Sequence, residues 1–251
     1  ENLSYTHQTL NAALLAEKIG IDVVADFRSR DLAAGGHGAP LVPAFHAQQF
    51  ASTDNVAIVN TGGIANLTLL PRDGEVSGFD CGPGNMLMDA WIFDQQGNLF
   101  DKNGAWAALG KSNKALLQSM LADPFFAKAP PKSTGRDHFH LGWLQEKIAN
   151  ENFLTEDVQA TLLHLTAHTI LESLAVYAAQ TQKLIVCGGG AKNTALMNLL
   201  KTKASDFLKH SLEISTSDEV GIDPQLVEGL AFAWLAWAHK EKRPANLPAV
   251  T

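Results

Sequence analysis

The stretch that decides the fold runs from residue 55 to residue 85 and reads NVAIVNTGGIANLTLLPRDGEVSGFDCGPGN. It contains three apolar runs, which lie at residues 56–60, 64–70 and 76–79. The runs are separated first by Thr61-Gly62-Gly63 and then by Pro71-Arg72-Asp73-Gly74, and the second spacer is typical of a hairpin turn. The stretch therefore predicts an antiparallel β-meander.

Outside this stretch the chain alternates between strand-like and helix-like patterns. Residues 21–27 (IDVVADF) and 184–187 are short apolar runs that predict buried strands, and residues 212–215 predict an edge strand. Helices are predicted at residues 10–19, 85–96, 114–121, 155–181, 195–203 and 226–239. The alternation predicts an α/β fold with a mixed sheet. We expect a domain junction at residues 40–55, where the chain leaves the first strand and crosses to the meander.

Composition limits the classes of function. The chain has 251 residues, 46% of them hydrophobic, and its 19 Lys and Arg against 26 Asp and Glu give a net charge of −7. An acidic chain lacks the clustered cations that nucleic acid or an anionic membrane requires, so neither is expected as the main partner. The two cysteines, Cys81 and Cys187, are far apart, and no apolar run reaches about 18 residues. We therefore expect a reducing cytoplasm and no membrane span.

Four glycine clusters, each expected at the end of a strand, are the first candidates for ligand binding. They are Gly35-Gly36 with Gly38, Gly62-Gly63, Gly82 with Gly84, and Gly188-Gly189-Gly190. A glycine turn lets backbone N–H groups approach a phosphate closely, although the same glycines also serve tight turns and close packing. Two familiar motifs fail by spacing. Residues 104–112 have one residue too many for a Walker A loop, and residues 188–193 end in Asn193 where a dinucleotide fingerprint needs Gly.

Asp80 is the leading ionisable candidate. It is expected at a strand end before a Gly-Pro-Gly turn, where a carboxylate can act as a general base near a transferring phosphoryl group, or simply cap the turn. Arg28 and Arg30 can each bind an anionic substrate, or form a local ion pair with Asp26 or Asp31.

Three further residues have weaker claims. Glu228 stands near the start of a predicted helix, where a carboxylate can simply offset the helix dipole. His164 and His168 share one helix face, but the neighbouring Glu of a zinc-binding His-Glu-x-x-His motif is absent, so no metal site is predicted there.

A resemblance to a known family covers essentially the whole chain, in order. The strings that carry it lie at residues 20–46 (GIDVVADFRSRDLAAGGHGAPLVPAFH), 60–71 (NTGGIANLTLLP), 78–91 (GFDCGPGNMLMDAW), 101–110 (DKNGAWAALG), 130–139 (PPKSTGRDHF), 186–197 (VCGGGAKNTALM), 227–237 (VEGLAFAWLAW) and 246–251 (NLPAVT). Together they resemble the anhydro-N-acetylmuramic acid kinase family.

The resemblance implies a fold and a reaction. The fold is the actin-like fold of sugar kinases and Hsp70-type ATPases, in which two ribonuclease-H-like α/β domains enclose a nucleotide cleft. In the implied reaction, water opens the 1,6-anhydro bridge of anhydro-N-acetylmuramic acid and ATP phosphorylates the freed O6. The product is N-acetylmuramic acid 6-phosphate, which enters peptidoglycan recycling. ATP and Mg²⁺ are thus the expected ligands besides the sugar.

The resemblance also implies roles for particular residues. Asp80 matches the general base that deprotonates the attacking water. Glu228, Gly62 and one of Arg28 or Arg30 match substrate-contacting positions, the arginine meeting the lactyl carboxylate of the sugar. The remaining matches are to nucleotide turns: Thr61, Gly62 and Gly63 to the second phosphate hairpin, and Gly188, Gly189, Gly190 and Asn193 to the adenosine-side turn. Residues 132–136 match without an assigned chemistry, and we expect them to be structural.

Members of the family begin with a strand and a Gly-Thr-Ser-x-Asp-Gly phosphate turn, and no string here matches that turn. We therefore expect residues 1–50 to be the remnant of a first actin-like domain and residues 51–251 to form the second. We also expect the 251-residue chain alone to be an inefficient kinase. Two alternatives stay open: another actin-like kinase acting on a hexose or hexosamine, and a non-enzymatic ATP-binding module of the Hsp70 kind. The Trp- and Phe-rich helix at residues 226–239 would suit a homodimer contact.

Overall fold

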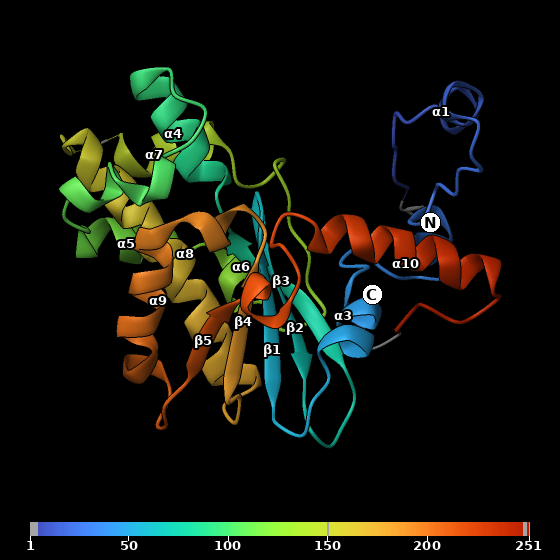
Figure 1. The fold of residues 1–251 in the computed structure, drawn as a ribbon. Coiled ribbons are helices and arrows are strands. Elements are labelled where there is room, and N and C mark those ends of the chain that lie inside the picture. The colour runs from blue at the N-terminus through green and yellow to red at the C-terminus, as the bar shows by residue number, and fades with distance from the viewer. Residues whose placement is uncertain (1–4, 150, 248–249, 251) are drawn as a thin grey trace.

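The structure, a computed structural model, describes residues 5–149, 151–247 and 250. Its centre is a five-stranded sheet in the order β3-β2-β1-β4-β5 (Figure 1). The strands are β1 (Val56–Thr61), β2 (Ile64–Leu70), β3 (Ser77–Pro83), β4 (Lys183–Cys187) and β5 (Glu213–Thr216). β1, β2 and β3 pair antiparallel, whereas β4 pairs parallel with β1 and with β5. The predicted meander is confirmed, and so is the edge strand.

Helices cover both faces of the sheet. They are α1 (Ala12–Ile19), α2 (Ser29–Ala33), α3 (Pro43–Phe50), α4 (Met86–Gln96), α5 (Lys114–Leu121), α6 (Pro124–Ala127), α7 (Leu141–Ile148), α8 (Thr155–Tyr177), α9 (Thr194–Phe207) and α10 (Val227–Lys240). Short 3₁₀ turns are η1 (Lys102–Gly104), η2 (Ala107–Leu109), η3 (Gly189–Lys192) and η4 (Ser217–Val220). In Figure 1, α4, α5, α7, α8 and α9 gather on one side of the sheet, and α3 and α10 lie on the other. The mixed α/β fold class expected from the sequence is confirmed.

The alternation of side chains along the strands builds two separate cores. On one face, Leu67 and Phe79 pack with the long helix α8, which also contacts α4, α5 and α9 and is therefore buried over most of its length. On the other face, Ile58 packs with Phe45 of α3 and Ala231 of α10. The second core is smaller, and it leaves room on its face for polar side chains near the end of the sheet.

The predicted strand at residues 21–27 is wrong, because the structure gives that segment no strand conformation. Its apolar residues have the local preference for a strand, but a strand also needs a neighbour for its backbone N–H and C=O groups. In the part of the chain that the structure describes, no strand lies beside it. The segment leads instead into α2, and the helices α2, α3, α6 and α7 were not predicted.

Across the described residues, no helix is both long and apolar enough to span a lipid bilayer.

Candidate active site

Three of the four glycine clusters lie close together at the end of the sheet where β1, β3 and β4 finish. β1, β3 and β4 run in the same direction, so their carboxyl ends lie together. The turn after β3 is bonded to the turn after β1: Gly84 N donates to Gly63 O at 2.9 Å and Asn85 N donates to Gly62 O at 2.8 Å. The Asn85 side chain adds a third bond, from Nδ2 to Thr61 O at 2.9 Å. These bonds hold the β1–β2 turn in one position.

Several of these glycines are needed for close packing. A Cβ on Gly84 would lie 2.4 Å from Gly62 O, and a Cβ on Gly190 would lie 2.5 Å from the Thr61 side chain. Gly63 and Gly189 are different, because both are exposed at the surface of the turns. The Thr61 hydroxyl is buried and has no hydrogen-bond partner among the described residues. This end of the sheet therefore combines a hydrogen-bonded backbone with open, glycine-lined turns. Such an arrangement suits phosphate groups.

The fourth cluster lies elsewhere. It follows α2 and not a strand, so the expectation that every cluster ends a strand is wrong for Gly35, Gly36 and Gly38. Here Gly38 N donates to Asp31 Oδ2 at 2.7 Å, and a Cβ on Gly36 would collide with the same carboxylate. This cluster forms a compact turn around Asp31.

Asp80 lies in a row of polar residues that crosses the sheet near this end. Register places Asp80 beside Asn66, Asn66 beside Asn60, and Asn60 beside Cys187. Phe79 and Cys81 belong to the core on the α8 face, so the alternation puts Asp80 and its row on the face covered by α3 and α10. Asn66 Oδ1 is buried without a hydrogen-bond partner among the described residues. Asp80 itself stands within β3, not at its end as predicted.

The Asp80 carboxylate is buried and held by backbone. Its side chain is 5% exposed, and Thr134 N donates to Oδ2 at 2.9 Å. Burial raises the pKa of the Asp80 carboxyl to about 6, although the Thr134 N–H, the Ser133 hydroxyl and the positive charges of Arg28 and Lys132 oppose the rise. A carboxyl with this pKa is largely ionised at pH 7 and can still accept a proton readily.

The geometry separates the two candidate arginines. Arg28 acts electrostatically on Asp80 and donates to Gly38 O, so it belongs to the same site. Arg30 is exposed and lines a different cavity of about 870 Å³, together with His239 and Arg243. Asp26, which also lines that cavity, accepts hydrogen bonds from the backbone and hydroxyl of Ser29.

Glu228 lies near the other end of this polar row, beside Cys187. It is exposed in the first turn of α10, and its charge adds to the burial that raises the pKa of the Cys187 thiol to about 12. Since Cys187 ends the row that contains Asp80, Glu228 and Arg28 lie near the two ends of one polar face.

Comparison with known proteins shows which family the chain belongs to. The family profile described as anhydro-N-acetylmuramic acid kinase matches residues 1–251. The chain belongs to the anhydro-N-acetylmuramic acid kinase family. It is 53% identical over 249 residues to the anhydro-N-acetylmuramic acid kinase of Pseudomonas paraeruginosa, covering 98% of this chain and 67% of that protein. It is 50% identical over 256 residues to the enzyme of the same name from Ralstonia nicotianae, covering 98% of this chain and 65% of that protein. The chain thus spans about two thirds of the length of these relatives.

Solved structures show a more distant likeness. One is the activator of the 2-hydroxyisocaproyl-CoA dehydratase from Clostridium difficile, at a TM-score of 0.49 and 17% identity over 83% of this chain and 70% of that one. Another is a diol dehydratase-reactivating factor, at a TM-score of 0.48 and 11% identity over 91% of this chain and 38% of that one. Neither likeness locates a site.

In this member of the anhydro-N-acetylmuramic acid kinase family, Asn193 has a structural task. Its Oδ1 accepts from Leu196 N at 3.1 Å and so caps α9, and it also lies against Gly104. Its expected contact with adenosine stays a prediction. The two histidines of α8 are likewise engaged locally: His168 lies 3.5 Å from the Glu172 carboxylate, and His164 is half-buried with its pKa lowered by burial.

Sequence reasoning missed two parts of the site, namely the Asn60 and Asn66 side chains and the segment at residues 132–134. The asparagines could have been found, because both alternate with apolar residues in predicted strands and so share a face with Asp80. The segment at 132–134 gave only a family match without a role, since its contact with Asp80 joins residues about fifty positions apart.

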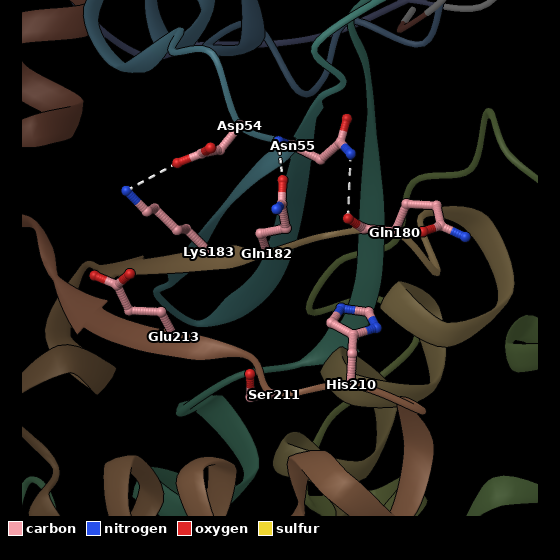
Figure 2. A pocket seen from close by; sticks show the side chains of 8 residues that line it. All are labelled: Asp54, Asn55, Gln180, Gln182, Lys183, His210, Ser211 and Glu213. Carbon is pink, nitrogen blue, oxygen red and sulfur yellow. Dashed lines mark hydrogen bonds and ion pairs between the residues drawn. The ribbon is translucent and has the colours of Figure 1, made fainter.

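A polar pocket at the opposite end of the strands is less suitable as a ligand-binding site (Figure 2). It lies where β1, β4 and β5 begin, far from the glycine turns. Lys183 Nζ and Asp54 Oδ2 are 3.0 Å apart, and Asn55 bonds to Gln182 Oε1 and to Gln180 O, each at 3.2 Å. These side chains bond mainly to one another, so they fasten the strand ends together and leave few groups for a ligand.

Proposed function

We propose that this protein is an ATP-dependent kinase that opens the 1,6-anhydro bridge of anhydro-N-acetylmuramic acid with water and phosphorylates O6. The observation that carries the proposal is the 50–53% identity, over 98% of the chain, to proteins of that name. The product, N-acetylmuramic acid 6-phosphate, would feed peptidoglycan recycling. Because the chain spans only about two thirds of its relatives, the activity is proposed for the protein at its full natural length.

The buried carboxylate of Asp80 would be the general base. It would take a proton from the water that attacks the anomeric carbon, and the cleaved bond would free O6 as the nucleophile toward the terminal phosphate of ATP. The pKa of about 6 fits this task, because the carboxylate is ionised at pH 7 and is a stronger base than an ordinary aspartate.

Arg28 would bind the lactyl carboxylate of the sugar. Of the two candidate arginines, it is the one whose charge acts on Asp80, and Arg30 faces another cavity. A guanidinium can bind a carboxylate with two parallel hydrogen bonds. Glu228 and Gly62 would complete the sugar contacts, and the unpartnered Asn66 Oδ1 would accept from a sugar hydroxyl or amide.

The glycine turns would hold the nucleotide. We propose that Thr61, Gly62 and Gly63 contact its phosphates and that Gly188, Gly189, Gly190 and Asn193 lie on the adenosine side. The buried, unpartnered Thr61 hydroxyl and the exposed Gly63 and Gly189 fit such a ligand. Among the described residues no group of three or more His, Cys, Asp or Glu could hold a metal ion. We propose that Mg²⁺ would bind with the nucleotide phosphates and would neutralise their charge.

We place the division between the two actin-like domains near residue 50, as the sequence suggested. We further propose a cytoplasmic enzyme, since both cysteines are free and buried. A homodimer contact through α10 would cover the exposed Leu230 and Trp237.

The test is a product assay in ¹⁸O-labelled water with the protein at its full natural length. We expect the 6-phosphate with label at C1, because only the anhydro-sugar reaction adds water there. Phosphorylation of glucose or N-acetylglucosamine without label would identify an ordinary hexose kinase instead. Asp80→Asn should abolish turnover and leave ATP affinity within a few-fold of the wild type; near-normal turnover would show that Asp80 is not the base.

A further inference from the structure

A segment between α6 and α7 runs along the free edge of the sheet beside Asp80. β3 is the edge strand, so its outward backbone groups need partners from outside the sheet. Asp80 N donates to Lys132 O at 3.0 Å, and Thr134 N donates back to Asp80 Oδ2 at 2.9 Å. The segment therefore forms hydrogen bonds with both the backbone N–H and the carboxylate of Asp80.

The strand is irregular at this point. Asp80 lies opposite Asn66 and Gly82 lies opposite Ala65, so Cys81 is an extra residue in β3. Such a bulge turns the neighbouring side chains relative to a regular strand. The direction of the Asp80 carboxylate therefore depends on contacts beyond the β2–β3 ladder, and residues 132–134 supply them.

Lys132 is an unusual residue for this place, because it is a lysine with only 6% exposure. Its Nζ lies 4.8 Å from the centre of the Phe125 ring and 3.4 Å from the Phe126 carbonyl oxygen. No carboxylate lies within ion-pair distance of Nζ in the described part of the chain. Burial lowers the pKa of Lys132, and the nearby acidic groups Cys81, Glu172 and Asp80 act in the opposite direction.

We propose that residues 132–134 are the positioning element of the proposed general base. The Thr134 N–H and the Ser133 hydroxyl fix the Asp80 carboxylate, and the buried Lys132 ammonium adds a smaller positive charge that favours its ionised form. This inference rests on the proposed function only in calling Asp80 the base. The groups that act on Asp80 are then Arg28 from the start of α2, Lys132 and Ser133 from the segment, and the neighbouring Cys81 thiol on β3.

The physical consequence is a coupling between Lys132 and the titration of Asp80. Removing the ammonium leaves burial less opposed, so the carboxylate becomes harder to ionise. In Lys132→Met, which keeps an unbranched apolar stem, the titration midpoint of Asp80 should rise by about 0.5–1 pH unit. Lys132→Arg, which keeps the charge, should return it toward the wild-type value. Ser133→Ala should raise it by a larger amount, because the Ser133 hydroxyl opposes the effect of burial more strongly than the Lys132 charge does.

The test has two readouts. ¹³C NMR of the Asp80 carboxyl carbon, assigned by its loss in Asp80→Asn, gives the midpoint in this chain, which should be about 6 in the wild type. The pH profile of kcat/KM, measured on the protein at its full natural length, should show its acid limb moving upward with the same midpoint. Lys147→Met is the matched control, since Lys147 also contacts an aromatic ring, Trp143 at 5.5 Å, away from the site.

The outcomes separate the two claims. An unchanged Asp80 midpoint in folded Lys132→Met and Ser133→Ala overturns the positioning role, whether or not the enzyme is active. A shifted midpoint in a protein that has no kinase activity supports the coupling and refutes the proposed function. If Lys132→Met does not fold, Ser133→Ala decides, because the Ser133 side chain is exposed and its loss leaves the packing of the segment intact.

Discussion

The contact between the turns after β1 and β3 can be tested by placing one methyl group at Gly84. The Cβ of Gly84→Ala would lie 2.4 Å from Gly62 O and 3.2 Å from Ala65 N and the Ile64 carbonyl carbon. All three are backbone atoms, so no side-chain rotation relieves the clash. Ordinary contact begins at 3.4 Å, so the two turns would have to separate by about 1 Å.

The size of the effect follows from two costs. Overpacking of a well-packed site costs about 1–3 kcal/mol. The same movement lengthens the bonds from Gly84 N to Gly63 O and from Asn85 N to Gly62 O, each worth about 0.5–1.5 kcal/mol net. Since these costs overlap, we expect Gly84→Ala to lower the free energy of unfolding by about 2–4 kcal/mol. ATP affinity should also fall by about tenfold or more, because the shifted turn would contact the phosphates.

Urea unfolding monitored by circular dichroism measures the stability, and ATP titration measures the affinity. Gly63→Ala is the matched control, because its Cβ would meet only Met86 Cβ at 3.7 Å, and its stability should stay within about 0.5 kcal/mol of the wild type. Equal stability of Gly84→Ala and wild type would refute the close contact between the turns.

Three further variants test burial and helix packing. Asp80→Asn should raise the free energy of unfolding at pH 7 by about 1–3 kcal/mol, because a carboxyl whose pKa is raised to about 6 destabilises the fold when it is ionised. This gain should shrink as the pH falls from 6 toward 4. Denaturation at pH 7 and at pH 4 measures both effects. His46 is 1% exposed and burial lowers its pKa to about 4, so stability should be lost as the pH falls from 6.5 toward 4, and unfolding of His46→Leu followed over that range should show a weaker dependence. Gly229→Ala in α10 should raise the melting temperature, since its Cβ meets nothing within 4 Å and alanine favours the helix by about 0.5–1 kcal/mol; a lower melting temperature would show that this position is not free.

The sequence predicts those parts of the fold that depend on neighbouring residues. The meander was predictable because its alternation and its turns lie within 30 consecutive residues, and the glycine turns were predictable for the same reason. The strand expected at residues 21–27 failed because pairing depends on a partner that local preference does not reveal. The helix α3 was missed between two prolines and the meander, although Pro43 is well placed at its first turn.

In the candidate site, too, local sequence patterns predict some features and long-range contacts determine the others. Asp80 was found from its turn, but its position within β3 depends on strand pairing. Its raised pKa comes from burial, and residues 132–134 partly oppose that rise, so neither effect is contained in a local pattern. The choice of Arg28 over Arg30 depends on where α2 begins, because that boundary directs one guanidinium to Gly38 and Asp80 and the other to a separate cavity.

The two buried cysteines flank this site and could report when it opens. Cys81 follows the proposed base and Cys187 precedes the Gly188 turn, and burial raises the pKa of each thiol to about 12. A thiol reagent can therefore modify either residue only after the local structure separates and admits solvent. Comparing the two labelling rates would show whether the edge strand β3, which contacts residues 132–134, and the end of the interior strand β4 open together or independently. A bound ligand that contacts both strands should slow both rates.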